Sequence, residues 1–188
     1  AASDVYKRQN YSNIPGENMI WADREGNIGW QAVGIAPIRN THSGLVPVMG
    51  DGRYEWVDYL PIIEKPNIFN PEEDFFATAN QNVTPISYDK WNAIGFSWSD
   101  PYRGDRVDDI LSSKNKLSMQ DMIDLQVDYF SYPSLYLIDL LNEVIDNENN
   151  FLSQYIRYID LLNDWDNKLL KNSVEAMIYV SWERTIIK

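Results

Sequence analysis

Asn80 follows a short apolar segment and carries a side chain that can stabilise a reaction intermediate. The segment comes after the turn at Asn70-Pro71 and runs from Phe75 to Ala79 before a run of amides. Apolar runs of this length, bounded by turn residues, are typical of buried strands, so the pattern predicts a strand at Phe75–Ala79. An Asn at the end of such a strand can donate its side-chain NH2 to a developing oxyanion. The alternative is that Asn80 only closes a turn, since Asn is a common turn residue.

Two arginines, Arg103 and Arg106, lie in the first turns of a helix predicted at Tyr102–Leu111. A cation at this end opposes the helix dipole, so each arginine needs a compensating partner. Asp109, one turn after Arg106, would be a sufficient structural partner. The other interpretation is that a guanidinium holds a neighbouring Asn or carboxylate, for which its planar fork of donors is suited.

Other side chains give weaker indications of chemistry. The sequence has no cysteine, which excludes disulfides, thiolate metal sites and a Cys nucleophile. Its single histidine, His42, lies in a polar loop, where a solvated residue is the better interpretation than a ligand. The oxygen-rich run Asp164-Trp165-Asp166-Asn167 lacks the spacing of an EF-hand. Metal ligands are therefore unassigned from the sequence.

The composition limits the class of partner. The chain has 188 residues, a net charge of −12, and 44% hydrophobic and 23% charged residues, which is typical of a globular protein with a core. Excess negative charge argues against binding to nucleic acid phosphates or to an anionic membrane surface. No apolar run reaches the roughly 18 residues that a membrane-spanning helix needs.

The first half of the sequence predicts strands and long loops. Asn18–Asp23 and Ile28–Val33 alternate around a turn that contains Gly26, a pattern that predicts a β-hairpin. Pro61 and Pro66 bracket Ile62–Glu64, which is too short and interrupted for a helix.

The second half predicts helices. Ser118 begins a capping sequence, and Ser173 is a candidate N-cap for a last helix. The predicted helical segments are Tyr102–Leu111, Met119 to about Tyr132, Ser134–Ile145, Phe151–Trp165 and the segment after Ser173, with a polar run at Asp146–Asn150. Strands first and helices later predict an α+β fold with helices layered on a sheet.

In order, these residues resemble the β subunit of the penicillin amidase family of N-terminal-nucleophile hydrolases. The collinear motifs are Asn18-x-x-Trp21-Ala22-Asp23-x-x-Gly26-Asn27-Ile28-Gly29-Trp30, Gly34-x-x-Pro37-Ile38-Arg39, Val46-Pro47-Val48-x-Gly50-x-Gly52-x-Tyr54-Glu55-Trp56, Leu60-Pro61, Asn70-Pro71, Phe76-Ala77-Thr78-Ala79-Asn80, Tyr102-Arg103-x-x-Arg106-Val107, Leu125-Gln126-x-Asp128 and Trp165-Asp166. Single motifs are weak, but their order and spacing over residues 14–187 are specific.

The resemblance implies part of an αββα sandwich and an acylase that hydrolyses a linear N-acyl bond through an acyl-enzyme. The nucleophile would be an N-terminal Ser whose own α-amino group is the base, and it would lie outside this chain. In the family pattern Asn80 donates to the oxyanion, and Arg106 lies beside that Asn. Glu17 takes the place of an apolar residue near the acyl pocket, which argues against a phenylacetyl preference. β-Lactam side-chain amides and N-acyl-homoserine lactones stay open as substrates.

The resemblance also carries expectations about organisation. Residues 1–9 fit no pattern and are expected to be a non-native leader, and 10–188 a β-subunit segment incomplete at both ends. The partners would be an α subunit and the rest of the β subunit, with neither nucleic acid nor a membrane. We expect no cofactor for the chemistry, a structural calcium bound partly by α-subunit groups, and a periplasmic or secreted bacterial location. The segment alone is expected to be inactive.

A rival interpretation is a non-catalytic, aromatic-rich binding module. The chain has seven Trp and 12 Tyr, residues that form platforms for glycans. This module would bind sugar by itself, whereas an acylase segment would not.

Overall fold

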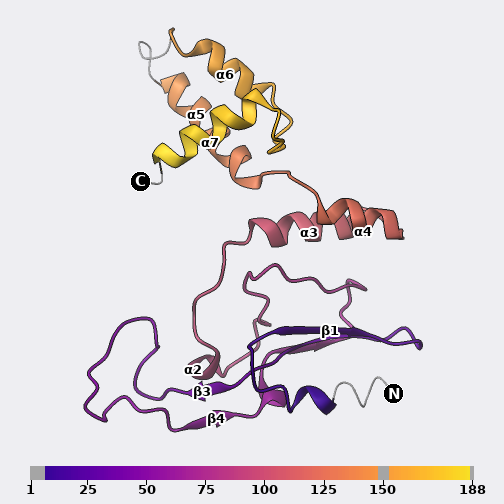
Figure 1. The fold of residues 1–188 in the computed structure, drawn as a ribbon, viewed down its shortest axis with the longest axis vertical. Helices are drawn as coiled ribbons and strands as arrows, with labels where there is room; N and C mark the ends of the chain where they lie inside the picture. Colours follow the sequence, from indigo (N-terminus) through magenta and orange to yellow (C-terminus); the bar gives the residue numbers. More distant parts are fainter. Residues whose placement is uncertain (1–6, 148–152, 187–188) are drawn as a thin grey trace. The chain divides into compact units, whose positions relative to one another are not determined.

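The computed structural model describes residues 7–147 and 153–186, and the chain divides into two compact units between Gly104 and Asp105. Its α+β order, with strands first and helices later, confirms the predicted fold class (Figure 1). Residues 7–9 form a helical turn, and Gln9 is only 2% exposed. The non-native leader stays a prediction, and residues 1–6 of it lie outside the described residues.

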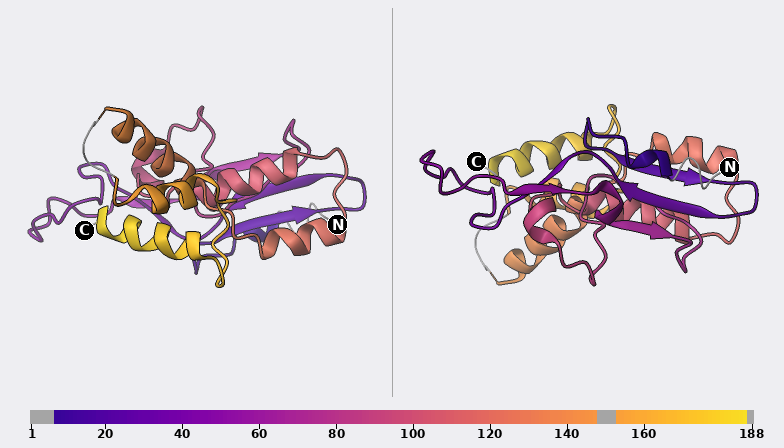
Figure 2. Two further views of the ribbon diagram at one scale, coloured as in Figure 1. Left: turned by 90° about the horizontal axis from the view of Figure 1, so that it is seen from above. Right: turned by 90° about the horizontal axis from the view of Figure 1, so that it is seen from below.

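The first unit is built on the predicted hairpin. Strands β1 (Asn18–Ala22) and β2 (Ile28–Ala32) pair antiparallel, and β5 (Asn67–Phe69) pairs with the other edge of β2 (Figure 2). Gly26 has φ +90° in the turn, a conformation that glycine adopts without strain.

A second, smaller sheet pairs β3 (Ala36–Ile38) with β4 (Asp58–Leu60), and the short helix α2 (Trp91–Ile94) packs on it. Ala36, Leu60 and Ala93 form the buried cluster of this layer. Ile62–Glu64, where no helix was predicted, forms the 3₁₀ helix η1, since a single tight turn fits between the two prolines. The buried Gln31 side chain donates to Ile62 O at 2.9 Å and ties η1 to β2.

The predicted strand at Phe75–Ala79 is wrong. These residues are irregular, and within the described part of the chain no strand pairs with them. Nearby side chains take the backbone donors instead: Gln81 Oε1 accepts the Ala79 N–H at 2.7 Å, and Thr78 Oγ1 accepts the Asn80 N–H at 3.4 Å. Such local acceptors compete with a strand ladder. Phe76 still packs against the sheet, because its ring stacks on Trp30 with centroids 4.8 Å apart.

The second unit contains the longer helices, and α3 (Tyr102–Ser112) begins just before the boundary between the units. Helix α4 (Met119–Gln126) starts at Ser118 with both bonds of a capping box to Asp121, as predicted. It ends about six residues before the predicted end near Tyr132, and a short non-helical segment separates it from the next helix, which begins at Tyr132. Pro133, with no N–H to leave unpaired, fits an early helical position.

Three helices share one apolar cluster. They are α5 (Tyr132–Asn147), α6 (Ile156–Asn163) and α7 (Val174–Ile186). The buried members of the cluster are Ile138, Leu162, Trp165, Ala176 and Tyr179. Ser173 Oγ accepts the Ala176 N–H at 3.0 Å, which confirms it as the cap of the last helix. Residues 148–152, which include parts of the predicted polar run and of the Phe151–Trp165 helix, lie outside the described residues.

Candidate functional site

Asn80 lies in an exposed turn with φ +72°, a left-handed conformation that Asn tolerates better than most residues. Three of its four polar groups are bound. Its N–H donates to Thr78 Oγ1, its backbone oxygen accepts Ser99 N–H at 3.1 Å, and its Oδ1 accepts Arg103 Nη2 at 2.9 Å. No bond from its Nδ2 is found within residues 7–147 and 153–186, so the NH2 group is the donor left for another molecule.

Neighbouring side chains hold the Asn80 turn in place. Arg103 Nη2 also donates to the Ala79 carbonyl at 2.7 Å, so one guanidinium nitrogen bridges the backbone and the Asn80 side chain. A Cβ added to Gly104 would lie 2.3 Å from Gln81 Nε2, so glycine lets the Gln81 side chain lie against the helix start. Gln81 in turn accepts the Ala79 N–H. The residues before and after Asn80 are thus both anchored to the first turn of α3.

Arg106 makes a different contact, within the second unit. Its Nη2 lies 2.7 Å from Asp128 Oδ2, with side chains 24% and 20% exposed, and its guanidinium covers the Phe130 ring at 4.5 Å. The suggested pairing with Asp109 is wrong, because the carboxylate that Arg106 binds is Asp128, while Asp109 accepts a hydrogen bond from the Tyr132 hydroxyl. The structure agrees with the second interpretation, a guanidinium that holds an Asn or a carboxylate. Arg103 holds an Asn, and Arg106 holds a carboxylate.

The Asp128 carboxyl responds to this pairing. Its partial burial raises the pKa, but hydrogen bonds from the Arg106 side chain and the Phe130 N–H outweigh burial, so the pKa lies below that of an ordinary Asp. The pair is therefore charged near neutral pH.

Glu17 and Asn80 line one cleft of about 700 Å³ in the first unit. Glu17 is exposed and directly precedes β1, with its backbone oxygen bound to Val33 N–H at 3.0 Å. Trp30 and Trp98 add aromatic surface to the same cleft. The structure thus brings together two of the three predicted site residues, Asn80 and Glu17.

The cleft also contains two cationic side chains, Arg39 and Lys65. Lys65 Nζ donates to the carbonyls of Val33 and Gly34 at 2.8 and 3.0 Å, and burial lowers its pKa. Arg39 Nη1 donates to Pro37 O and Ala93 O, each at 3.4 Å. Both cations therefore tie backbone segments of the cleft wall together.

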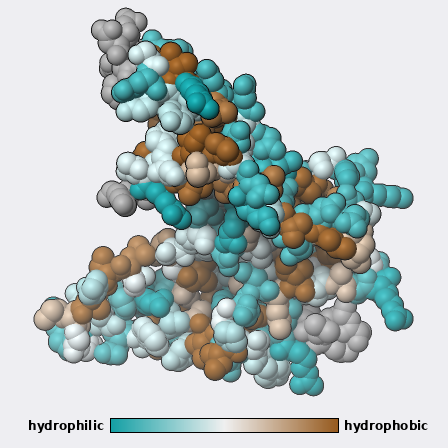
Figure 3. Space-filling model, turned by 45° about the horizontal axis from the view of Figure 1, so that its top comes forward, coloured by the Kyte–Doolittle hydropathy of each residue, from teal (hydrophilic) through white to brown (hydrophobic). Residues whose placement is uncertain are grey.

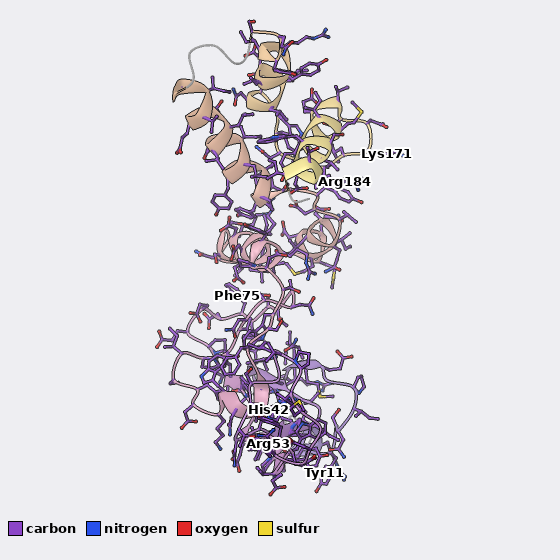
Figure 4. The ribbon with its side chains drawn as sticks, turned by 90° about the vertical axis from the view of Figure 1, so that its left-hand side faces the viewer. Tyr11, His42, Arg53, Phe75, Lys171 and Arg184 are labelled. Carbon is purple, nitrogen blue, oxygen red and sulfur yellow. The ribbon has the colours of Figure 1, made fainter. Side chains whose placement is uncertain are left out.

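His42 lies in the loop region next to Arg53, as Figure 4 shows, and its ring meets Tyr54 edge-on at 5.9 Å between centroids. It is half-buried rather than fully solvated. Among the bonds found in the described residues, His42 has neither a carboxylate nor a nucleophile as a partner.

The structural calcium stays a prediction. No group of three or more His, Cys, Asp or Glu side chains that could hold a metal occurs within 7–147 and 153–186. In the 164–167 run, Asp166 Oδ1 accepts the Lys168 N–H and Asn167 Oδ1 accepts the Ser134 hydroxyl, so these oxygens already serve the fold. Among the helices of this part of the chain, none is both long and apolar enough to cross a membrane.

Sequence reasoning missed the cooperation of Arg103, Gln81 and Gly104 around Asn80. A signal was present, since a glycine in the first turn of a helix is unfavourable unless another group must approach closely. It could not say which group approaches.

Comparison with known proteins gives consistent matches. The family model described as penicillin amidase matches residues 2–188. Acyl-homoserine lactone acylase QuiP of Pseudomonas fluorescens (strain Pf0-1) is 31% identical over 179 residues, which is 86% of this chain and 21% of that protein. Penicillin G acylase of Escherichia coli is 30% identical over 109 residues, covering 57% of this chain and 13% of that protein.

Among solved structures, thermostable penicillin G acylase from Alcaligenes faecalis has a TM-score of 0.69 at 22% identity. The match covers 88% of this chain and 30% of that one, and it supports the fold. The chain spans about a fifth of the length of the acyl-homoserine lactone acylases it matches.

Proposed function

Because this chain belongs to the penicillin amidase family, we propose that it is part of an acylase that hydrolyses a linear N-acyl amide. The observation that carries the proposal is the unused NH2 group of Asn80 in a turn that lines a cleft of about 700 Å³. A neutral donor held at the edge of a cleft suits an oxyanion, whose charge develops only in the transition state.

The proposed reaction passes through an acyl-enzyme. An N-terminal Ser outside this chain attacks the amide carbonyl, with its own α-amino group as base, and the amine leaves. Water then attacks the ester carbonyl and releases the acid and the free Ser. Asn80 Nδ2 donates to the oxyanion of each tetrahedral intermediate, a contribution of about 3–4 kcal/mol in comparable sites.

Arg106 stays a predicted catalytic residue, and its pair with Asp128 supplies a way to test it. If Arg106 acts only by holding Asp128, then Arg106→Met and Asp128→Asn lower activity equally, since each breaks the same contact. A catalytic Arg106 predicts a larger loss of kcat in Arg106→Met. Equal kcat values for the two variants would remove Arg106 from the catalytic residues.

Glu17 is proposed to act on the acyl group. A carboxylate that lines the cleft disfavours an apolar acyl chain, because burying it against hydrocarbon without a partner is costly. Glu17→Leu is therefore expected to raise kcat/KM for phenylacetyl amides relative to acyl groups that carry a hydrogen-bond donor. An unchanged ratio would place Glu17 outside the acyl pocket.

The proposed partners are an α subunit and the rest of the β subunit. Large apolar side chains are exposed at four-residue intervals along α4 and the residue directly after it, at Met119, Ile123 and Val127, which are 78%, 52% and 57% exposed. Figure 3 shows apolar side chains, in brown, reaching the surface on the face it presents. Exposed apolar stripes of this kind mark interaction surfaces. The acyl-homoserine lactone acylase that the chain matches is about five times as long, and we propose that the rest of such a protein covers this surface.

Two further proposals rest on the family alone. The first is a structural calcium bound partly by groups of the α subunit, and metal analysis of the purified full-length protein tests it. Export to the periplasm or the medium is tested by fractionating cells that express the gene.

The experiment that tests the proposed function compares the full-length protein with residues 1–188. The full-length protein is expected to release acid from N-acyl-homoserine lactones or from penicillin G, and to show an acyl adduct on its N-terminal Ser by mass spectrometry. The isolated chain is expected to release none. The proposal would be contradicted if the full-length protein hydrolysed neither class of amide, or if the isolated chain showed turnover.

A further inference from the structure

We infer that Trp98 is a specificity-determining residue, whose indole ring packs against an apolar group attached to the scissile amide. The inference rests on the proposed function, in which Asn80 donates to the oxyanion. It adds a residue that selects among substrates, whereas Asn80 acts on the carbonyl that all amides share.

The backbone places Trp98 beside Asn80. Ser99 N–H donates to the Asn80 carbonyl at 3.1 Å, and Trp98 directly precedes Ser99. Because consecutive Cα atoms are only about 3.8 Å apart, the Trp98 side chain begins close to the turn that carries the Asn80 amide. Both residues line the cleft of about 700 Å³. A substrate whose carbonyl oxygen meets the Asn80 amide therefore has its neighbouring groups within reach of the Trp98 ring.

An aromatic cluster holds the Trp98 ring. The loop of residues 80–99, closed at its ends by the Ser99 bond, packs on its own side chains. Trp91 meets Trp98 edge-on with centroids 5.7 Å apart, and it stacks on Phe96 at 6.0 Å. Tyr88 meets Trp91 edge-on at 6.3 Å. Such aromatic pairs have preferred geometries, so the cluster restricts the Trp98 ring before any substrate binds.

Hydrogen bonds also attach this loop to the rest of the first unit. The Tyr88 hydroxyl donates to the Glu64 carbonyl at 3.1 Å, and Arg39 N–H donates to the Asn92 carbonyl at 3.1 Å. Burial, followed by nearby carboxylates, raises the pKa of Tyr88 to about 12, so its hydroxyl remains a donor at neutral pH. The part of the cleft wall that the loop supplies is therefore held in place from outside the loop as well as from within.

The two tryptophans of the cleft differ in what they offer a substrate. Trp30 is 2% exposed, its ring stacks on Phe76, and its Nε1 donates to Asn18 Oδ1 at 2.8 Å. The fold therefore already uses most of its surface. Trp98 is 37% exposed, so part of its ring remains for a ligand. Aromatic surface of this kind in a cleft is what binds the apolar parts of small molecules.

Phe96 provides a matched control in the same aromatic cluster. It also packs against Trp91 and is 48% exposed, but it does not line the cleft. A loss of packing in the cluster would affect Phe96→Ala and Trp98→Ala alike. Loss of a substrate contact would be confined to Trp98→Ala.

The test uses the full-length protein and the variants Trp98→Ala, Trp98→Phe and Phe96→Ala, with thermal unfolding measured for each. Two series of amides are compared by kcat/KM. One series keeps the acyl group and enlarges the amine from ammonia to homoserine lactone to the β-lactam nucleus of penicillin. The other keeps the amine and lengthens the acyl group from acetyl to hexanoyl.

Trp98→Ala is expected to lower kcat/KM by about 10–100-fold for the largest group of one series and little for the smallest, because apolar contacts in a pocket discriminate on this scale. Trp98→Phe retains an aromatic ring and is expected to restore part of this dependence on size. Phe96→Ala is expected to leave the dependence as in wild type. The series that loses its size dependence assigns Trp98 to the acyl or to the amine side of the substrate.

Three results would overturn the inference: an unchanged size dependence in Trp98→Ala, an equal loss for small and large groups, or the same change in Phe96→Ala. The equal loss would mean that Trp98 only supports the Asn80 turn. If Trp98→Ala does not fold, the size dependence of Trp98→Phe decides in its place. If the wild-type protein hydrolyses neither class of amide, the proposed function fails and this inference fails with it. If wild type is active, the Trp98 variants decide the inference separately.

Discussion

Asn80 and Asn167 have the same left-handed backbone, with φ +72° and +59°, but different surroundings. Asn167 uses both ends of its amide within the fold. Its Oδ1 accepts the Ser134 hydroxyl at 2.7 Å, and its Nδ2 donates to Trp165 O at 3.3 Å. Among the bonds found in the described residues, the Asn80 amide is bound through Oδ1 and not through Nδ2. A left-handed Asn is thus a turn former in both units, and a remaining unbound donor is what distinguishes a candidate for chemistry.

Burial separates the two turns further. Ser134, which Asn167 holds, is 0% exposed, so that amide replaces water for a fully buried hydroxyl. Asn80 is exposed in a turn that lines a cleft, and its contact with Arg103 orients it without covering it. We therefore expect substitutions at Asn80 to affect turnover and substitutions at Asn167 to affect stability.

The largest expected effect is on turnover by Asn80→Ala in the full-length protein. Loss of one oxyanion donor lowers kcat on the order of 10²–10³-fold in comparable sites, with little change in KM. Steady-state kinetics on an N-acyl amide measures this. Asn167→Ala, corrected for the folded fraction, serves as the control and retains kcat. A near-normal kcat in Asn80→Ala would contradict the oxyanion role of Asn80.

The second prediction concerns the stability of the second unit. Asn167→Ala is expected to lower the free energy of unfolding by about 2 kcal/mol, since it leaves a buried Ser134 hydroxyl with one acceptor fewer and places Cβ of alanine at positive φ. Urea denaturation followed by circular dichroism measures the change. Asn167→Gly is the matched variant, because it relieves the backbone strain and isolates the loss of the amide. A stability equal to wild type in both variants would contradict a structural role for Asn167.

Local structure was predictable where the signal lies in neighbouring residues. The hairpin of β1 and β2, the cap at Ser118 and the start of α7 follow from alternation, Gly26 and capping side chains close in sequence. The apolar pattern of Phe75–Ala79 predicted a strand that does not form. Its backbone donors are taken by Thr78 and Gln81, and the pattern of hydrophobicity does not record that competition.

The site was predictable by type but not by pairing. A helix start with two arginines indicated that guanidiniums hold an Asn or a carboxylate. The choice of Asn80 for Arg103 and of Asp128 for Arg106 depends on contacts 23 and 22 residues apart. Such separations are set by how the units fold, and sequence spacing along a helix cannot supply them.

The third prediction tests Arg106 and Asp128 by acid. The folded-state pKa of Asp128 lies below that of an ordinary Asp, because bonds from Arg106 and the Phe130 N–H outweigh the opposing effect of burial. An unfolded Asp has an ordinary pKa, so this contribution to stability is fully present above that value and is lost as pH falls through the folded pKa. Asp128→Asn is expected to cost about 1–2 kcal/mol near neutral pH and to flatten the pH dependence. Urea denaturation from neutral to acid pH measures both.

An exposed ion pair provides the control for the acid experiment on Asp128. Asp51 pairs with Arg53 at the surface, and exposed pairs contribute little to stability. Asp51→Asn is therefore expected to leave the acid dependence unchanged. A slope equal to wild type in Asp128→Asn would show that the Arg106 pair, like the surface pair, does not stabilise the fold.

The smallest expected effect is at the start of α4. Ser118 accepts the Asp121 N–H at 3.2 Å, and its own N–H donates back to Asp121 at 2.7 Å, so Ser118→Ala leaves one helix donor without its cap. Loss of such a cap costs about 1 kcal/mol. Denaturation of the chain measures it, and Ser118→Asp is the variant expected to restore the cap. Because the cap is far in sequence from Asn80, kcat of the full-length protein is expected to stay normal. A loss of turnover in Ser118→Ala would show that contacts which stabilise the second unit also affect the Asn80 amide in the first.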